Sequence, residues 1–189
     1  RLFLVSIPVY AYESDDVVSL RRGFEKENLR NITKAFDNVC IVLNVSNIID
    51  LSWINDEEYN GSIKSVIIVW QGGMEGGTAV VDVLSGAETP SGKLADTIAY
   101  RIADYLSTKK FGDEFKNLYE EDIYIGYRYF ETFAPDKVQF EFGYGLSYTT
   151  FDIETQTVKE KTDSIELNVK VTNTGDKFAG KEVVQVYYE

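Results

Sequence analysis

The chain has 189 residues, of which 44% are hydrophobic, and a formal net charge of −12. It can therefore hold one domain of ordinary size and part of another. The acidic excess argues against nucleic acid and anionic membrane surfaces as partners, because both attract Lys and Arg. The sequence has no histidine, which excludes Ser-His-Asp and Cys-His catalysis and leaves carboxylates as the main acid and base groups.

The single cysteine and the N-terminus limit the redox and targeting interpretations. Cys40 lies within an apolar run, so we interpret it as a small buried hydrophobe and not as a nucleophile. No stretch reaches the length of a membrane span. The chain opens at Arg1 without a signal-peptide pattern, so we expect this start to be a cut, and the localisation stays open.

The first apolar run, residues 2–9, predicts a strand, and Pro8 suits its end. A polar loop with Glu13, Asp15 and Asp16 follows. In open α/β sheets, ligands bind where loops leave the strands. The loop therefore has two interpretations, a catalytic or sugar-binding carboxylate and a solvated loop with a helix-capping Asp, and the residues alone favour the second.

Alternating elements follow this loop. Residues 24–36 have apolar positions at helical spacing, which predicts a surface helix. Residues 39–43 and 65–70 are apolar runs typical of strands buried on both faces, and 56–59 can form a short helix between them. The order predicts a parallel sheet with helical crossovers.

A glycine-rich turn at 71–77 follows the second of these strands and opens a helix that Gly86 and Pro90 close. Such a turn can cradle phosphate, but the G-x-G-x-x-G spacing and a following Lys-Ser/Thr are absent. We therefore favour close backbone packing as its purpose. Glu75, at the helix start, is a second carboxylate to consider, and helix capping is its favoured interpretation.

Residues 90–115 predict a long surface connection with one short helix at 101–105. Two stretches rich in Tyr, Phe and Gly, 120–130 and 142–149, then predict a packed seam between two architectures.

After the seam, the alternation at 165–171 and 184–188 predicts two strands, and 151–158 adds a weaker one. This is the start of an antiparallel β-sandwich, with about three strands where such a fold needs roughly seven. We therefore expect a fragment or a chain that needs a partner.

Five stretches, in this order and at this spacing, resemble glycoside hydrolase family 3, whose members include β-glucosidases and β-xylosidases. They are WQGGMEGG at 70–77, DVLSG at 82–86, PSGKL at 90–94, YIGYRYF at 124–130 and FGYGLSYT at 142–149. Residues 171–175 and 180–187 are similar to early strands of the fibronectin-III-like domain of that family.

The resemblance implies an α/β fold, a three-layer sandwich around a mostly parallel sheet, followed by part of a fibronectin-III-like antiparallel β-sandwich. We place a partial α/β sandwich domain at 1–118, an aromatic connecting segment at 119–150 and a partial fibronectin-III-like domain at 151–189. Five tyrosines are expected to lock the two domains together: Tyr124, Tyr127, Tyr129, Tyr144 and Tyr148.

The resemblance also implies part of a retaining, exo-acting β-glycosidase that acts on a β-linked glucoside or oligosaccharide without metal or organic cofactor. In this family a barrel domain carries the nucleophile, and the sandwich lends the acid/base. The barrel is absent from this chain, and the resemblance leaves open on which side it lies. The chain alone is expected to be inactive. Its expected partners are the barrel domain of the same protein and further copies of the chain in a homo-oligomer.

Glu13 is the candidate acid/base residue, because many family members carry that glutamate in a G-E-G-x-D-R-like loop and residues 12–16 match its place. Both flanking glycines and the arginine are replaced here. Either Arg21 or Arg22 supplies the displaced arginine, or the loop has lost its catalytic role. The alternatives to an enzyme are a non-catalytic carbohydrate-binding or interaction module and a flavodoxin-like nucleotide binder.

Overall fold

The computed structural model describes residues 3–8, 24–59, 61–109, 115–116 and 118–188. The chain forms two compact units, each built from two segments. The first comprises Arg1–Gly77 and Asp96–Phe142, and the second comprises Thr78–Ala95 and Gly143–Glu189. The domain boundaries expected from the sequence stay a prediction.

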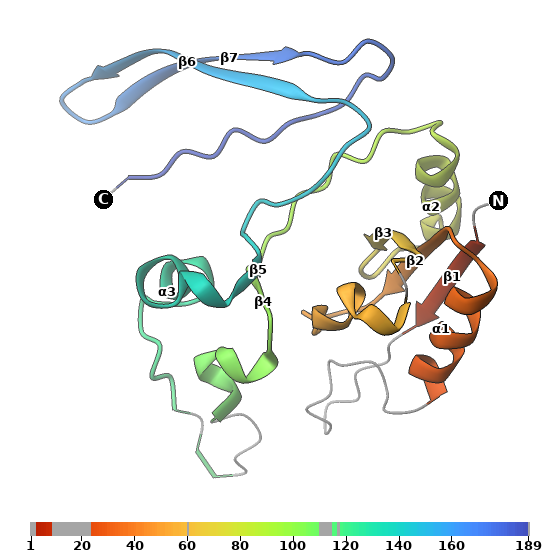
Figure 1. Cartoon of the computed structure of the whole chain (residues 1–189). Helices are drawn as coiled ribbons and strands as arrows, with labels where there is room; N and C mark the ends of the chain where they lie inside the picture. Colours follow the sequence, from red (N-terminus) through yellow and green to blue (C-terminus); the bar gives the residue numbers. More distant parts are fainter. Residues whose placement is uncertain (1–2, 9–23, 60, 110–114, 117, 189) are drawn as a thin grey trace. The chain divides into compact units, whose positions relative to one another are not determined.

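The first unit contains a parallel sheet in the order β1 (Phe3–Pro8), β2 (Val39–Asn44) and β3 (Ile63–Ile68). Helix α1 (Phe24–Ala35) connects β1 to β2 and lies beside the sheet (Figure 1). The parallel sheet with its helices, followed by antiparallel strands, confirms the predicted fold class.

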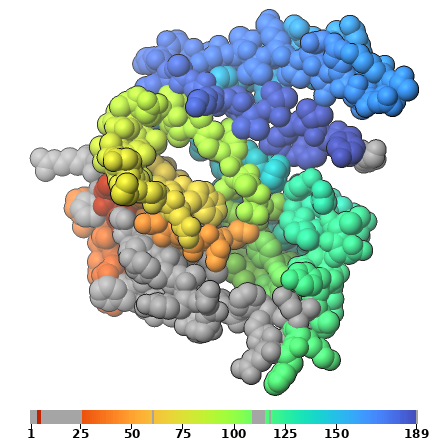
Figure 2. Space-filling view, turned by 180° about the vertical axis from the view of Figure 1, so that it is seen from behind, coloured from red at the N-terminus to blue at the C-terminus, as the bar shows by residue number. Residues whose placement is uncertain are grey.

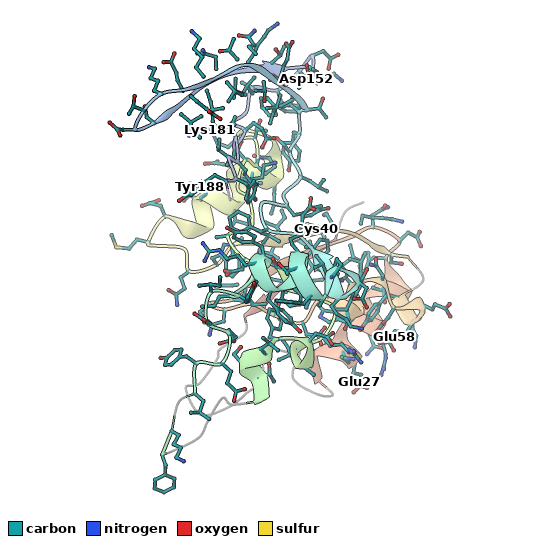
Figure 3. All side chains as sticks on the ribbon, turned by 90° about the vertical axis from the view of Figure 1, so that its left-hand side faces the viewer. Glu27, Cys40, Glu58, Asp152, Lys181 and Tyr188 are labelled. Carbon is teal, nitrogen blue, oxygen red and sulfur yellow. The ribbon has the colours of Figure 1, made fainter. Side chains whose placement is uncertain are left out.

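Strand β2 forms the centre of this sheet. Its first five residues are at most 5% exposed, as the continuous apolar run predicts for a strand buried on both faces. Cys40, labelled in Figure 3, is one of them and is buried, which confirms its interpretation as a small buried hydrophobe. From α1, the side chains of Leu29 and Thr33 are buried as well.

The strand predicted at 65–70 is not buried on both faces, as its apolar run had suggested. It is observed as β3, in which Lys64 and Ser65 are exposed and the later residues are half-buried. Within the described sheet β3 is an edge strand, so only one of its sides is paired. Between β2 and β3 lie two 3₁₀ turns, Ser52–Asn55 and Glu57–Tyr59, and the second is the short helix predicted at 56–59.

The prediction of a surface connection at 90–115 is wrong in its middle. Strand β4 (Ile98–Ala99) is buried and pairs antiparallel with β5 (Val138–Phe140). The predicted short helix is a pair of 3₁₀ turns, Ile102–Asp104 and Leu106–Lys109. A two-residue apolar run has no periodicity, and its partner strand lies about forty residues later, so the local sequence gives no strand signal.

A small core holds β4 against helix α3 (Tyr127–Phe133). Ala99, Phe130 and Ala134 are buried there, with Tyr105 packed against them. The Tyr105 hydroxyl donates to the Thr97 carbonyl (2.8 Å) and accepts from the Ala99 N–H (2.9 Å). Burial raises the pKa of Tyr105. A 3₁₀ turn, Pro135–Lys137, then leads into β5.

Each aromatic contact among the described residues that involves the predicted seam lies within one unit. Tyr124 and Tyr129 both pack against Phe133 in the first unit, whereas Tyr148 packs against Phe178 in the second. The expected lock between the two domains therefore stays a prediction.

The second unit contains the antiparallel pair β6 (Phe151–Glu160) and β7 (Ile165–Asn173), which Figure 2 shows as a blue band of side chains. On it, Asp152 is exposed (Figure 3). The strand predicted at 184–188 is not formed: residues 174–188 contain no strand, and Val186 is 59% exposed. Alternating residues form a strand only where a neighbouring strand accepts their backbone groups.

Helix α2 (Gly76–Ser85) ends as the sequence predicts. Gly86 has a φ of +79° and donates its N–H to the Val83 carbonyl (3.1 Å), a left-handed C-terminal residue that favours glycine. The Tyr148 hydroxyl donates to the same carbonyl (2.8 Å). One of the aromatic residues of the predicted seam thus adds a second hydrogen bond to a carbonyl in the last turn of the helix.

Two of the family-like stretches meet in the second unit, where 91–94 and 143–145 form a backbone clamp. The Leu94 N–H donates to the Tyr144 carbonyl (2.8 Å), and the Gly143 N–H donates to the Leu94 carbonyl (2.7 Å). The Lys93 ammonium donates to the Gly145 carbonyl (2.7 Å). These stretches are therefore joined by direct hydrogen bonds.

A third stretch closes the clamp. The Lys93 ammonium lies 3.1 Å from the Glu182 carboxylate, and both side chains are mostly buried. The Lys181 N–H donates to the Ser91 hydroxyl (3.0 Å). The pKa of the Glu182 carboxyl is held below its ordinary value. The main cause is the hydrogen bond that the Val183 backbone N–H donates to it, and the Lys93 ammonium adds to the effect.

The clamp makes Gly145→Ala destabilising. A Cβ at this position would collide with the Gly92 carbonyl oxygen and lie 3.0 Å from the Lys93 side chain. We expect the free energy of unfolding to fall by about 1–3 kcal/mol, as for other overpacked sites. Gly92→Ala is the matched control, because its Cβ meets nothing within 4 Å. Urea unfolding of both variants measures the difference, and equal midpoints would contradict the clamp.

Candidate active site at the carboxyl edge of the parallel sheet

The three parallel strands end together at one edge of the sheet. Pro8, the last residue of β1, is paired with Asn44, the last residue of β2. The Val69 N–H, just after β3, donates to the Leu43 carbonyl (2.9 Å). The segments that follow β1, β2 and β3 therefore all leave from this edge, which is where open α/β sheets bind ligands.

Glu13, the candidate acid/base, follows β1 by five residues and lies outside the described residues, as do Arg21 and Arg22. Its role as acid/base stays a prediction.

The segment after β2 offers polar groups at the same edge. Asn44, Ser46 and Asn47 are exposed. The Asp50 carboxylate further along accepts from the Ser52 backbone N–H (2.9 Å) and hydroxyl (2.6 Å). Asp50 thus forms a local side-chain turn with Ser52, the first residue of the following 3₁₀ turn, which is a structural use of a carboxylate.

The segment after β3 begins with a strained residue. Trp70 has a φ of +48°, in the left-handed region that costs a residue with a side chain about 1–2 kcal/mol. Its side chain is half-buried. Sequence reasoning included Trp70 in a motif but gave it no role, because a backbone angle leaves no trace in the pattern of residue types.

The glycine-rich turn next to Trp70 is tightly packed on itself. A Cβ on Gly72 would lie 3.1 Å from the Gly76 Cα, and the Gly76 N–H donates to the Gly73 carbonyl (3.0 Å). At Gly72 this supports the interpretation that glycine allows close backbone packing, whereas a Cβ on Gly73, Gly76 or Gly77 would meet nothing within 4 Å. Glu75, just before α2, is exposed, and its capping role stays a prediction.

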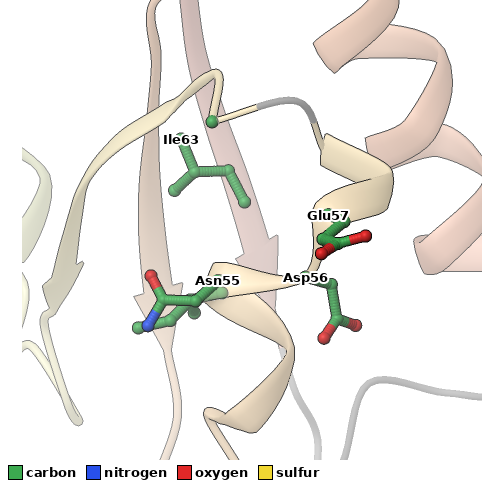
Figure 4. Close-up of a pocket in the computed structure, with 6 residues that line it drawn as sticks. Asn55, Asp56, Glu57 and Ile63 are labelled. Carbon is green, nitrogen blue, oxygen red and sulfur yellow. The ribbon is translucent and has the colours of Figure 1, made fainter.

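A shallow pocket of about 400 Å³ lies at the opposite edge, where β3 begins (Figure 4). Asn55, Asp56, Glu57 and Ile63 line it.

Within the ranges that the structure describes, no group of three or more His, Cys, Asp or Glu residues could hold a metal ion. No described helix is long and apolar enough to cross a membrane. The carboxyl edge is the candidate site, because the segments after all three parallel strands leave from it.

Comparison with protein families gives a match over most of the chain. The model of the glycosyl hydrolase family 3 C-terminal domain matches residues 3–148. A β-glucosidase of Ruminococcus albus is 51% identical over 165 residues, which are 87% of this chain and 17% of that protein. β-Glucosidase A of Butyrivibrio fibrisolvens is 43% identical over 182 residues, 87% of this chain and 21% of that protein.

Solved structures agree. A β-glucosidase of Paenibacillus barengoltzii superposes with a TM-score of 0.88 at 53% identity, covering 95% of this chain and 20% of that one. The β-glucosidase of Kluyveromyces marxianus in complex with glucose gives a TM-score of 0.83 at 33% identity, covering 94% and 21%. The chain thus spans about a fifth of the length of these proteins.

Proposed function

Because the chain belongs to glycosyl hydrolase family 3, as its C-terminal domain, we propose that it is part of a retaining, exo-acting β-glycosidase of the β-glucosidase kind. The observation that carries this proposal is the 51% identity over 165 residues with the β-glucosidase of Ruminococcus albus. The proposed substrate is a β-linked glucoside or oligosaccharide.

Retaining cleavage needs two carboxyl groups on either side of the glycosidic bond, about 5–5.5 Å apart. One attacks the anomeric carbon, and the other protonates the leaving oxygen and then activates water. We assign the acid/base role to Glu13 and the nucleophile to a barrel domain outside this chain. The loop of Glu13 leaves from the edge at which the strand ends meet, and this placement supports the assignment.

The acid/base role sets a requirement for the surroundings of Glu13. A proton donor must hold its proton near the working pH, so its pKa has to lie above that of an exposed glutamate. Burial of the loop against the barrel domain would supply that shift by penalising the charged form. We expect this chain to be inactive when it is separated from the barrel domain.

One observation favours a second candidate, a non-catalytic carbohydrate-binding or interaction module. Residues 12–16 lack the glycines and the arginine of the acid/base loop, so the loop is altered where the chemistry would take place. Such a module would bind a sugar without cleaving it.

An assay separates the two candidates. The chain joined to its barrel domain is incubated with nitrophenyl β-glucoside, and the anomeric configuration of the first product is followed by NMR. Release of β-glucose supports the retaining glycosidase, and the isolated chain should release none. Sugar binding without hydrolysis by the joined protein would favour the module. Saturable nucleotide binding to the isolated chain would instead support the nucleotide-binding alternative.

A further inference from the structure

Two segments of the second unit run side by side without forming a sheet. Residues 178–182, which we call the strap, follow residues 86–93 in the same direction. The neighbouring pairs are Gly86 and Phe178, Thr89 and Gly180, Ser91 and Lys181, and Lys93 and Glu182. Neither segment contains a strand, and within the described ranges no backbone–backbone hydrogen bond joins them. Side chains therefore decide whether the strap stays in place.

The first half of the strap is held by packing. The Phe178 ring lies against the ring of Tyr148, with centroids 5.5 Å apart. A Cβ on Gly180 would lie 3.2 Å from the Thr149 side chain and 3.3 Å from that of Thr89, so glycine lets the strap lie close to its neighbours. These contacts carry no charge, and a change of pH leaves them as they are.

The second half of the strap has a different attachment. The Lys181 N–H donates to the Ser91 hydroxyl (3.0 Å), which is a single neutral hydrogen bond; Lys181 is labelled in Figure 3. Next to it the Lys93 ammonium lies 3.1 Å from the Glu182 carboxylate, and the two side chains are 15% and 16% exposed. Charges shielded from water attract more strongly than exposed ones. Loss of one partner would leave the other mostly buried without its counter-charge.

We propose that the pair of Lys93 and Glu182 is an ionic latch that keeps the strap closed, and that neutralising Glu182 releases the second half of the strap. The clamp formed by 91–94 and 143–145 should survive the release. Lys93 also donates to the Gly145 carbonyl (2.7 Å), so it stays bound to the clamp without Glu182. The other printed contact of the Glu182 carboxylate is local, the N–H of Val183 (2.9 Å).

Acid is the expected trigger of the latch. Among the described residues, Lys93 is the charged group that faces the Glu182 carboxylate. The pKa of Glu182 is lowered from 4.5, first by the hydrogen bond from the Val183 N–H and then by Lys93. A carboxyl with a lowered pKa contributes stability that is complete above its ordinary pKa and is lost as the pH falls through the lowered value. The strap should therefore be closed at neutral pH and open in acid.

Amide hydrogen exchange of the whole chain, followed residue by residue by NMR, tests the latch. The Lys181 N–H reports on the strap, and the N–H groups of Leu94 and Gly143 report on the clamp. At neutral pH, Glu182→Gln should accelerate exchange at Lys181 by about tenfold, the factor that 1.4 kcal/mol produces, and leave both clamp amides unchanged. Asp176→Asn, at an exposed carboxylate just before the strap, is the matched control and should change none of them.

A double-mutant cycle and a pH series complete the test. Lys93→Met should accelerate exchange at Lys181 as Glu182→Gln does, and the double variant should add little, because the latch is already broken. In the wild type, acidification to about pH 3 should accelerate Lys181 relative to Leu94 after correction for intrinsic rates, whereas Glu182→Gln should show no such step. Unchanged exchange at Lys181 in Glu182→Gln, equal acceleration at Lys181 and Leu94, or additive single variants would each overturn the latch.

Discussion

Glu13→Gln should lower kcat/KM of the joined protein for cellobiose by about 10²–10⁴-fold, the usual contribution of a general acid/base. A poor leaving group such as glucose needs the proton that glutamine cannot supply. Nitrophenolate leaves without protonation, so the nitrophenyl substrate should still form the glycosyl-enzyme intermediate, which then accumulates because no base activates water. The measurements are steady-state kinetics on both substrates and a pre-steady-state burst with the nitrophenyl substrate.

Azide sharpens the assignment of Glu13. It attacks the intermediate without needing a base, so it should accelerate turnover of the nitrophenyl substrate in Glu13→Gln and yield β-glucosyl azide. Asp15→Asn, two residues further along the loop, is the matched control and should neither lose activity nor respond to azide. Full activity of Glu13→Gln on cellobiose would refute the acid/base role.

Phe130→Ala should lower the free energy of unfolding by about 3–5 kcal/mol, the cost of replacing a buried Phe. Its ring is 1% exposed and packs edge-to-face on Tyr105, with ring centroids 5.2 Å apart. The resulting cavity should loosen α3 from β4, so the backbone amides of Ile98 and Ala99 should exchange faster with deuterium.

Phe133→Ala provides the comparison for Phe130→Ala. It lies in the same helix but is 59% exposed, and its ring packs only on Tyr124 and Tyr129, so its loss should cost about 1 kcal/mol, clearly less than the loss of Phe130. Urea unfolding gives the two free energies, and hydrogen exchange followed by mass spectrometry gives the local effect at β4. Equal destabilisation by the two variants would contradict the position of Phe130 in the core.

How far the sequence predicts this fold depends on where the signal for each element resides. Strand β2 is predicted correctly because five consecutive apolar residues leave few alternatives. Strand β4 is missed, since its two residues gain strand geometry only from β5 forty residues later. The strand expected at 184–188 fails for the opposite reason: its alternation is present, but no neighbouring strand in the described ranges pairs with it.

The sequence predicts some features of the candidate site and not others. The predicted parallel sheet is formed, and the ends of its three strands meet at one edge. Glu13 itself lies outside the described residues, and its assignment still depends on resemblance. The positive φ of Trp70 is visible only in the structure, because a backbone angle leaves no trace in the residue types. A bulky residue directly before a glycine-rich turn is the one signal that sequence reasoning could have used.

The two compact units are interleaved along the chain. The polypeptide runs through the first unit, enters the second at Thr78, returns to the first at Asp96 and re-enters the second at Gly143. During synthesis, the clamp residues at 91–94 must therefore wait for 143–145 to leave the ribosome before their hydrogen bonds can form. The chain passes between the units at three places, 77/78, 95/96 and 142/143. A single proteolytic cut at one of them cannot release either unit intact, because each unit also contains a segment from elsewhere in the chain. Truncation at residue 142 would remove residues 143–189, with which the segment 78–95 forms the second unit. Expression boundaries for this protein should therefore include both segments of each unit.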